Sequence, residues 1–456
     1  MRSRLEMKVE LRITSLGLTA LFLTMAGAAS AQTTTGWRWD ALPAGAPPEE
    51  HLFSREHPAG FLRRPGGLTP DTWFHDGHLR TYALLNLGDV VRTAEISRGR
   101  GPVFMFGNAR RPQLLDEVSG TFDHPKYPKR EAALSVREML GSLNCQAVIV
   151  VRNGKIVFEE YAGMDPGQRH HWMSISKSSL NILLGKLVGE GKLDLTKRVD
   201  EYLPELKDRG YGSFTLQELC DMNADVNMDE KNYLDPQSSF WDFGRSVGWF
   251  GDDGKWPGGN RQYLATLVRL PRPEGEGGQR VRYTSSNSQV LAWVVERVTG
   301  RSYVEVFEQE IWQRIGAVAP ASVTIDKQGF PSVGGGFSST LRDLARYGLI
   351  WARRGVAPDG TRIFPEAWMT ENTSGKGPLL SDHHYHNQSY SRDGAIIHQG
   401  HSGQMLWVRP ESGTIVATFG SSTTPESGSP WSRQAYLWAA ESIERSLRER
   451  QIAERE

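Results

Sequence analysis

The chain is poor in cysteine, balanced in charge and free of internal repeats. Two of its 456 residues are cysteines, and lysine plus arginine equal aspartate plus glutamate at 53 each. A formal net charge of zero gives no indication of nucleic-acid binding or of attraction to a membrane surface. Two cysteines, Cys145 and Cys220, are too few for a disulfide framework. Both stand in apolar surroundings, so in an exported protein they either form one disulfide or remain buried free thiols.

The N-terminus has the features of a secretory signal peptide. Four basic residues precede an apolar stretch over residues 13–27, and the small residues Ala29-Ser30-Ala31 follow before Gln32. This order of basic, apolar and small residues is typical of such peptides, and the apolar stretch is short for a membrane span. We therefore expect residues 1–31 to be removed on export to the periplasm or beyond. We expect no stable membrane anchor, because no cysteine follows the small residues to carry a lipid.

Residues 32–130 form an N-terminal extension in this interpretation. They are rich in proline, glycine, arginine and aromatic residues, and their apolar residues show little regular spacing. Residues 81–87 are either a strand or the start of a helix. The composition predicts an irregular segment packed on the main body, without identifiable chemistry.

Residues 131–456 have the regular apolar spacing of a folded domain. They predict a helix at 134–143, a buried strand at 147–151, a turn at Asn153-Gly154 and a strand at 155–161. Two strands at 401–410 and 414–420 precede a last helix at 432–450. The predicted helices between these ends are 174–188, 216–222, 260–267, 288–298, 303–315, 341–353 and 365–369. The pattern predicts an α+β fold: an antiparallel sheet built from both ends and flanked by helices, with a mostly helical subdomain inserted over about residues 174–320.

Ser174 and Lys177 stand three residues apart at the start of a predicted helix. Positions i and i+3 share a helix face, so the Lys177 ammonium can reach the Ser174 hydroxyl. Residues 178–188 are strongly apolar, and a lysine buried beside them is costly unless it has partners or a task. The pair fits a serine nucleophile that works without histidine. Taken alone it is also expected by chance, with Ser174 as a helix N-cap.

Two further segments fit the same chemistry, although for Tyr283 alone a structural role is the better interpretation, and for the second segment alone a structural role is equally good. Tyr283 precedes a predicted helix and can act as a base if its pKa falls from about 10. We expect a neighbouring Lys177 ammonium to lower that pKa. The run Gly400-His401-Ser402-Gly403-Gln404 is predicted to lie on a strand. There the backbone N–H groups of Gln404 and Ser174 would form an oxyanion hole.

In this order and spacing, the three segments resemble the serine β-lactamase and penicillin-binding-protein family over about residues 134–425. Further segments look like its class C-like branch, which includes class C β-lactamases, D-alanyl-D-alanine carboxypeptidases, family VIII esterases and 6-aminohexanoate-dimer hydrolases. These segments are Gly191-Lys192-Leu193-Asp194-Leu195, Glu201-Tyr202-Leu203-Pro204, Val298-Thr299-Gly300, and Gly335-Gly336-Phe337 leading to Arg342-Asp343-Leu344-Ala345-Arg346. The resemblance implies a β-lactamase/transpeptidase-like fold. It also implies that Ser174 is the nucleophile and that Lys177 and Tyr283 share the acid/base work.

Two departures from class C β-lactamases bear on the substrate. Ser285 stands where those enzymes have asparagine, and His401-Ser402-Gly403 replaces a motif that begins with lysine. Both changes weaken the recognition of carboxylates and β-lactams. With them, the two segments look more like those of the 6-aminohexanoate-dimer hydrolases. The resemblance therefore implies an exported serine hydrolase that cleaves a small amide or ester through an acyl-enzyme on Ser174, without cofactor or metal. It places substrate or oxyanion binding at Ser285, His401, Ser402, Gly403 and Gln404.

Two alternatives stay open at this point. One is a β-lactamase or D-alanyl-D-alanine carboxypeptidase. The other is a non-catalytic protein on the same fold that binds a peptide or a peptidoglycan fragment, although such a binder need not keep Ser174, Lys177 and Tyr283 together.

Several histidines and aromatic residues stand in contexts that indicate where they lie in the fold. Histidines at 170, 171, 383, 384 and 386 lack an H-E-x-x-H or cysteine partner, so we expect exposed loop histidines in place of a metal site. Trp172 and Tyr390 are predicted to shape the pocket. Four others either line the cleft or form the core of the helical subdomain: Tyr233, Trp241, Trp249 and Trp256.

Overall fold

The computed structural model describes residues 64–122, 133–231, 233, 235–271, 281–380, 382–422 and 430–453. The predicted signal peptide lies outside these residues, as do 32–63 and 123–130 of the predicted extension. Within the described segments, no helix is both long and apolar enough to cross a membrane.

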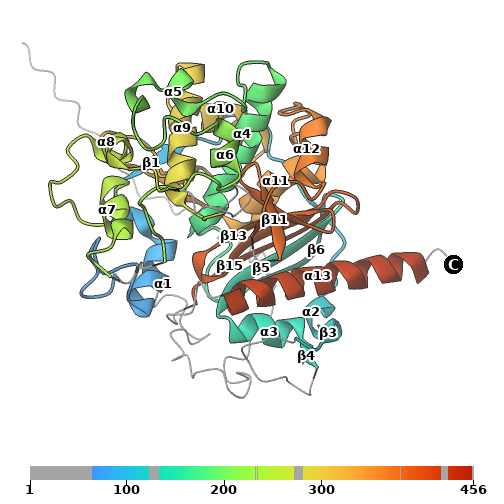
Figure 1. The fold of residues 1–456 in the computed structure, drawn as a ribbon. Helices are drawn as coiled ribbons and strands as arrows, with labels where there is room; N and C mark the ends of the chain where they lie inside the picture. The colour runs from blue at the N-terminus through green and yellow to red at the C-terminus, as the bar shows by residue number, and fades with distance from the viewer. Residues whose placement is uncertain are drawn as a thin grey trace, which may run out of the picture. The chain divides into compact units, whose positions relative to one another are not determined.

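The two ends of the main domain form one mixed but largely antiparallel sheet, as predicted (Figure 1). Strand β15 pairs with β5 and so joins the C-terminal strands to the N-terminal hairpin, whose turn residues Asn153 and Gly154 have φ of 49° and 72°. Strand β2 is parallel to β6. In spatial order the described strands are β10 (Leu379–Leu380), β11 (His383–His386), β12 (Ser389–Arg392), β13 (Ala395–Gly400), β14 (Gln404–Arg409), β15 (Thr414–Gly420), β5 (Cys145–Arg152), β6 (Lys155–Tyr161) and β2 (Gly107–Asn108).

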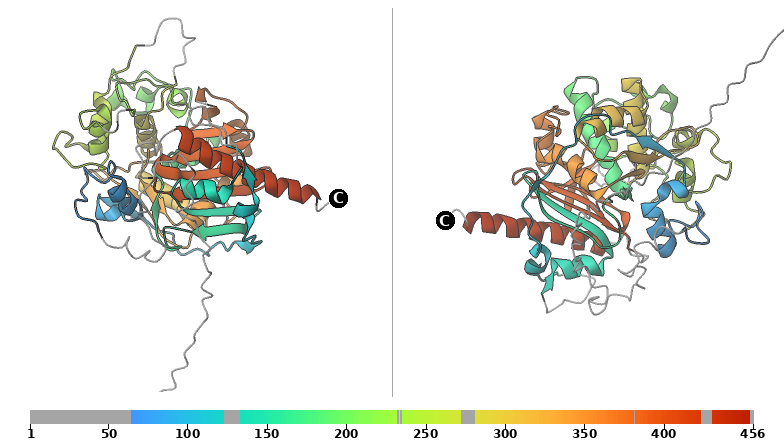
Figure 2. Two further views of the ribbon diagram at one scale, coloured as in Figure 1. Left: turned by 90° about the horizontal axis from the view of Figure 1, so that it is seen from below. Right: turned by 180° about the vertical axis from the view of Figure 1, so that it is seen from behind.

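The central strands are mostly apolar because helices cover both faces of the sheet. In β5, Ile149 and Val151 join the core on one face, and Val148 and Val150 join the core on the other. Helix α11 (Leu341–Ala352) contacts the first face. Helices α3 (Val136–Ser142) and α13 (Pro430–Ala453) cover the second (Figures 1 and 2).

The stretch between β7 (His170–His171) and β8 (Ala321–Thr324) carries most of the other helices, as the prediction of a helical insertion requires. In the described residues these are α4 (Ser178–Gly189), α5 (Val199–Tyr202), α6 (Leu216–Cys220), α7 (Ser239–Ser246), α8 (Gly259–Thr266), α9 (Ser285–Thr299) and α10 (Tyr303–Glu310). Helix α12 (Glu366–Asn372) follows α11. A small second sheet, of order β1-β8-β9-β7, was not predicted; its remaining strands are β1 (Thr93–Ile96) and β9 (Phe337–Ser339).

The extension is more regular than predicted. Residues 81–85 belong to helix α1 (Gly77–Leu85), whose N-terminus is capped by the Asp76 side chain. Strand β1 pairs antiparallel with β8, which ties the extension into the small sheet. The short helix α2 (Leu114–Glu117) and strand β3 (Ser119–Gly120) also belong to the extension, and β3 pairs antiparallel with β4 (Leu134–Ser135) of the main domain.

The two cysteines are free and fully buried, so of the two alternatives left open by the sequence the structure has the free thiols. Cys145 lies at the start of β5 and Cys220 at the end of α6. Burial raises the pKa of both thiols, which keeps them protonated.

Candidate active site

Ser174 stands directly after a sharp change of chain direction. Strand β7 ends at His171, and a 3-10 turn, η3 (Met173–Lys177), leads into α4. Met173 has φ of 49°, a left-handed conformation that is strained for a side chain of this size. The turn presents Ser174 to a pocket of about 600 Å³. The local fold therefore exposes a hydroxyl while its neighbours Met173 and Ile175 remain in the core.

Lys177 lies beneath Ser174, as the i, i+3 spacing predicted. Its side chain is 2% exposed, and its Nζ donates hydrogen bonds to Ser174 Oγ at 3.1 Å and to the Gly334 carbonyl at 2.6 Å. Burial lowers the pKa of Lys177 from its ordinary value of 10.5 to about 8, although the negative charge of Glu230 acts in the opposite direction. Lys177 is therefore still mostly an ammonium at neutral pH but gives up its proton at mildly alkaline pH.

Tyr283 completes the group, but its pKa moves against the prediction. Its hydroxyl is hydrogen-bonded to Ser174, and Lys177 Nζ lies 4.8 Å from the centre of its ring. Desolvation raises the pKa of Tyr283, and the charge of Glu230 raises it further. The prediction that Lys177 lowers this pKa was wrong, because the ammonium lies over the ring face while burial and Glu230 disfavour the phenolate. Tyr283 is a phenol in the free protein.

The third segment forms a turn where a strand was predicted. Strand β13 ends at Gly400, residues His401–Gly403 form the 3-10 turn η6, and β14 begins at Gln404. Ser402 takes a left-handed φ of 68°, which interrupts the extended chain. A side chain at Gly400 would come within 2.5 Å of the Trp172 carbonyl. Glycine here lets β13 lie against the turn that carries Ser174.

Only part of this segment faces the pocket. Gly400 and His401 line it. Ser402, Gly403 and Gln404 are buried behind it, with the Gln404 amide donating to the His401 and Gly420 carbonyls. The His401 Nδ1 is 2.8 Å from Ser402 Oγ, and burial holds the pKa of His401 well below its ordinary value, so its ring is neutral. The oxyanion role of the Gln404 backbone N–H stays a prediction.

Glu230 is a pocket residue that the sequence did not indicate. It lies in the loop before α7, and its carboxylate accepts a hydrogen bond from the backbone N–H of Ser285, the first residue of α9. Ser285 itself lines the pocket, and its role in substrate binding stays a prediction. Glu230 thus connects the loop to the helix that follows Tyr283. No motif marks it, since a lone glutamate in a polar loop resembles any surface residue.

An aromatic wall forms another part of the pocket, with Phe74 at its centre. Its ring centroid lies 5.2 Å from that of His401, 5.9 Å from that of Tyr233 and 6.4 Å from that of Trp249. Tyr233, Trp249 and Tyr390 line the pocket, which for Tyr390 agrees with the prediction. Trp172 does not line the pocket, contrary to the prediction. It is fully buried against Trp312, Phe337 and Tyr347. Trp241 and Trp256 are core residues of the helical region.

The expectation of exposed loop histidines was wrong for four of the five; the fifth, His384, is partly exposed but lies on strand β11. His170 and His171 are fully buried on β7, and His383 and His386 are buried on β11. Each of these strands is covered, and burial lowers the pKa of His170 and His171 to about 4 and about 3. In the described residues no cluster of three or more histidine, cysteine, aspartate or glutamate side chains is arranged to hold a metal ion.

Comparisons with known proteins place the chain in a family. The sequence profile of the β-lactamase family matches residues 136–437. A 6-aminohexanoate-dimer hydrolase from Paenarthrobacter ureafaciens is 32% identical over 387 residues, which cover 81% of this chain and 93% of that protein. Among solved structures, a Bacillus anthracis protein assigned as a 6-aminohexanoate-dimer hydrolase superposes with a TM-score of 0.72 at 24% identity, covering 84% of this chain and 98% of that one. EstCE1, a hydrolase with promiscuous acyltransferase activity, has a TM-score of 0.51 at 15% identity over 67% of this chain and 98% of its own. The chain therefore belongs to the β-lactamase family and is a serine hydrolase with the α+β fold of that family.

Proposed function

We propose that the protein is an exported serine hydrolase that cleaves linear amides or esters of small molecules through an acyl-enzyme on Ser174. The observation that carries this proposal is the contact of Ser174 with both Lys177 and Tyr283 at one end of an open pocket. A nucleophile, a group near its ionisation point and a proton donor within hydrogen-bond reach are what acyl transfer needs.

The proposed acylation follows from the two pKa shifts. Neutral Lys177 is available at mildly alkaline pH, so its Nζ takes the proton of Ser174 as Oγ attacks the substrate carbonyl. Tyr283 is still a phenol and gives its proton to the departing nitrogen or oxygen. The Lys177 ammonium then returns a proton to Tyr283, so the net change is transfer of the serine proton to the leaving group. Water releases the acid by the reverse sequence.

A linear substrate is favoured by the pocket and by the relatives. The aromatic wall around Phe74 suits an extended apolar chain, and the pocket also contains acidic and basic side chains, among them Glu230 and Arg433. Such a pocket suits a molecule with apolar methylenes and polar ends, as in the 6-aminohexanoate dimer named for the Paenarthrobacter relative. The neutral His401 supplies no cation for the carboxylate of a β-lactam.

The test measures hydrolysis of p-nitrophenyl acetate, p-nitrophenyl butyrate, nitrocefin and the 6-aminohexanoate dimer by the wild type and by Ser174→Ala. We expect the wild type to cleave the esters or the linear amide and to form a fluorophosphonate adduct at Ser174. Ser174→Ala should lose at least about 1000-fold in kcat, because an activated nucleophile is removed. Absence of both hydrolysis and adduct in the wild type would refute the proposal; rapid turnover of nitrocefin would favour the β-lactamase alternative.

Export is the part of the proposal that depends on residues 1–31. Their basic, apolar and small segments support cleavage before Gln32. Mass spectrometry of the N-terminus after expression in a Gram-negative host tests this: a periplasmic protein beginning at Gln32 is expected, and an uncleaved cytoplasmic protein would contradict it.

A further inference from the structure

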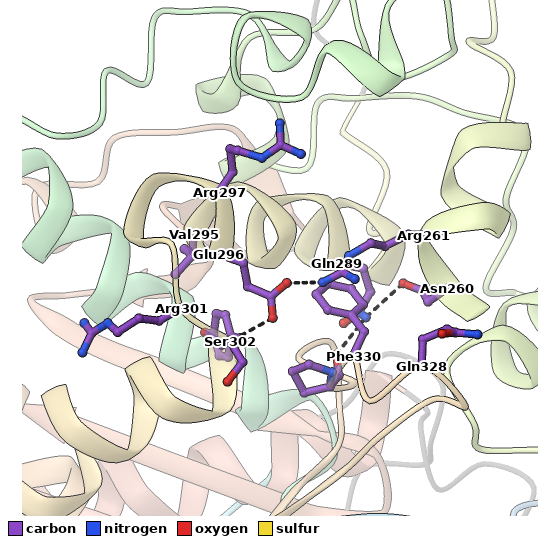
Figure 3. A network of polar contacts seen from close by, with 12 residues as sticks. Asn260, Arg261, Gln289, Val295, Glu296, Arg297, Arg301, Ser302, Gln328 and Phe330 are labelled. Carbon is purple, nitrogen blue, oxygen red and sulfur yellow. Dashed lines mark hydrogen bonds and ion pairs between the residues drawn. The ribbon is translucent and has the colours of Figure 1, made fainter. Parts of the chain in front are cut away.

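Gln289 is a fully buried amide whose hydrogen bonds all lead to fixed groups near the site. It lies on α9, and its Nε2 donates to Asn260 Oδ1 at 3.0 Å and to the Pro331 carbonyl at 3.0 Å. Its Oε1 accepts from the Gly334 backbone N–H at 3.0 Å. Figure 3 shows the amide between Asn260 and the segment that follows Phe330. The orientation of the amide is determined, because an N–H faces its oxygen and a carbonyl faces its nitrogen.

Gly334 connects this amide to the catalytic lysine. The N–H of Gly334 is held by Gln289, and the carbonyl of the same residue accepts the hydrogen bond from Lys177 Nζ at 2.6 Å. A side chain at Gly334 would come within 3.1 Å of Ser285 Cβ, so glycine lets this loop approach the start of α9. Because Gln289 binds both Pro331 and Gly334, it fixes two points of the loop that carries the Lys177 acceptor.

The amide is itself held by a rigid support. Helices α8 and α9 are joined by the Asn260–Gln289 hydrogen bond and by an ion pair between Arg261 and Glu296 (Figure 3). Two further hydrogen bonds hold Asn260 in place: its Nδ2 donates to Ser246 Oγ at 2.9 Å, and its backbone N–H donates to Asp326 at 2.8 Å. Gln289 does not line the pocket. Its effect on the substrate is therefore indirect.

We propose that Gln289 is a positioning residue, which aims the Gly334 carbonyl so that Lys177 Nζ stays beside Ser174 Oγ. The inference rests on the proposed roles of Ser174 and Lys177. A buried amide is not needed for packing, since an apolar side chain of the same size fills a helix interface without three obligatory hydrogen bonds. The charged or titratable groups that face Lys177 are Glu230 and Tyr283, and neither depends on the amide directly.

The experiment compares Gln289→Met with Ser288→Ala. Methionine keeps the length of glutamine without its polar atoms. Ser288 is the neighbouring residue on α9, is equally buried, and donates to Gln388 Oε1 at 2.6 Å, away from Gly334. Both variants thus lose buried hydrogen bonds from one helix, and only one of them loses contact with the lysine acceptor. Gln289→Glu is a second variant that retains an oxygen for the Gly334 N–H.

We expect Gln289→Met to lose about 10- to 100-fold in kcat with p-nitrophenyl acetate, because a small displacement of a catalytic group has effects of this size. Its KM should stay within about threefold of wild type, since ground-state binding is unchanged. The acidic limb of its pH–rate profile should move to lower pH, because a misaligned carbonyl stabilises the ammonium less. Gln289→Glu should retain more activity, and Ser288→Ala should keep wild-type kcat and pH profile despite any loss of stability.

The outcomes separate the two levels of inference. A wild type that neither hydrolyses esters nor forms the Ser174 adduct refutes the proposed function. A wild type that does both, with Gln289→Met indistinguishable from Ser288→Ala in kcat and pH profile, overturns the positioning role of Gln289. If Gln289→Met fails to fold, Gln289→Asn takes its place, because its amide is one methylene too short to reach the Gly334 N–H; an unchanged kcat and an unmoved acidic limb in that variant overturn the positioning role equally.

Discussion

Replacing Lys177 by methionine should abolish activity without destabilising the protein at neutral pH. Burial lowers the pKa of Lys177 from 10.5 to about 8. Because one pKa unit corresponds to about 1.4 kcal/mol, holding the ammonium in the folded state costs about 3 kcal/mol at neutral pH. Methionine removes this cost but leaves the Gly334 carbonyl without its donor, a penalty of about 1–3 kcal/mol. At pH 7 the variant should therefore match the wild type or exceed it by up to about 2 kcal/mol.

The sign of the pH dependence makes this prediction specific. Between about pH 8 and pH 10.5 the unfolded wild type binds the lysine proton and the folded protein does not. This group therefore increases the free energy of unfolding of the wild type as pH rises. Lys177→Met lacks this contribution at every pH. Its stability relative to wild type should consequently fall by about 3 kcal/mol across that window.

Urea denaturation of the wild type, Lys177→Met and Ser174→Ala at pH 7, 8, 9 and 10.5 measures the effect. Ser174→Ala is the matched control, since it is also expected to be inactive but retains the lysine. Its stability difference from wild type should change little with pH. A pH-independent difference for Lys177→Met would refute the reasoning, because it would mean that the folded and unfolded states bind the lysine proton equally.

Two further substitutions test the environment of the site. Glu230→Gln keeps an oxygen for the Ser285 N–H but removes a charge that raises the pKa of Lys177, so the acidic limb of kcat/KM should move to lower pH; an unmoved limb in the pH–rate profile would contradict this. Phe74→Leu shortens the aromatic wall beside His401 and should raise kcat/KM for p-nitrophenyl butyrate relative to acetate by up to about tenfold. The measured quantity is the ratio of kcat/KM for the butyrate to kcat/KM for the acetate. The core variant Trp241→Leu, measured in parallel, should keep the wild-type ratio if the effect belongs to the pocket wall.

The sheet and the contact between Ser174 and Lys177 were predictable because their signals are local. The hairpin around Asn153-Gly154 has a turn sequence with a single favoured geometry, and the apolar strands beside it need covered faces. The i, i+3 relation of Ser174 and Lys177 fixes their contact once the helix start is recognised. The grouping of Tyr283 with Ser174 and Lys177 required the order of the motifs as well, since nothing in its neighbours in the sequence marks this tyrosine.

The features that could not be predicted from the sequence depend on contacts between residues that are far apart in the chain. The polar strand His383–His386 lacks an alternating apolar pattern and is set by pairing with β12, where Tyr385 faces Tyr390. Phe74 enters the pocket from a segment that precedes Ser174 by 100 positions of chain, and no spacing rule connects them. The direction of the Tyr283 pKa depends on Glu230 and on loss of water, which are properties of the folded pocket.

The neutral state of His401 bears on the substrate more strongly than its position does. In the class C-like pattern a cation at this place would attract a carboxylate, and a histidine could do so only if protonated. Here His401 is enclosed by Phe74 and Tyr233, and the positive charges of Arg80 and Arg433 further disfavour its protonated form. Its Nδ1 is also engaged by Ser402. We infer that His401 contributes an apolar ring face and a neutral nitrogen to the pocket, so any cation for a substrate carboxylate has to come from another pocket residue, such as Arg433.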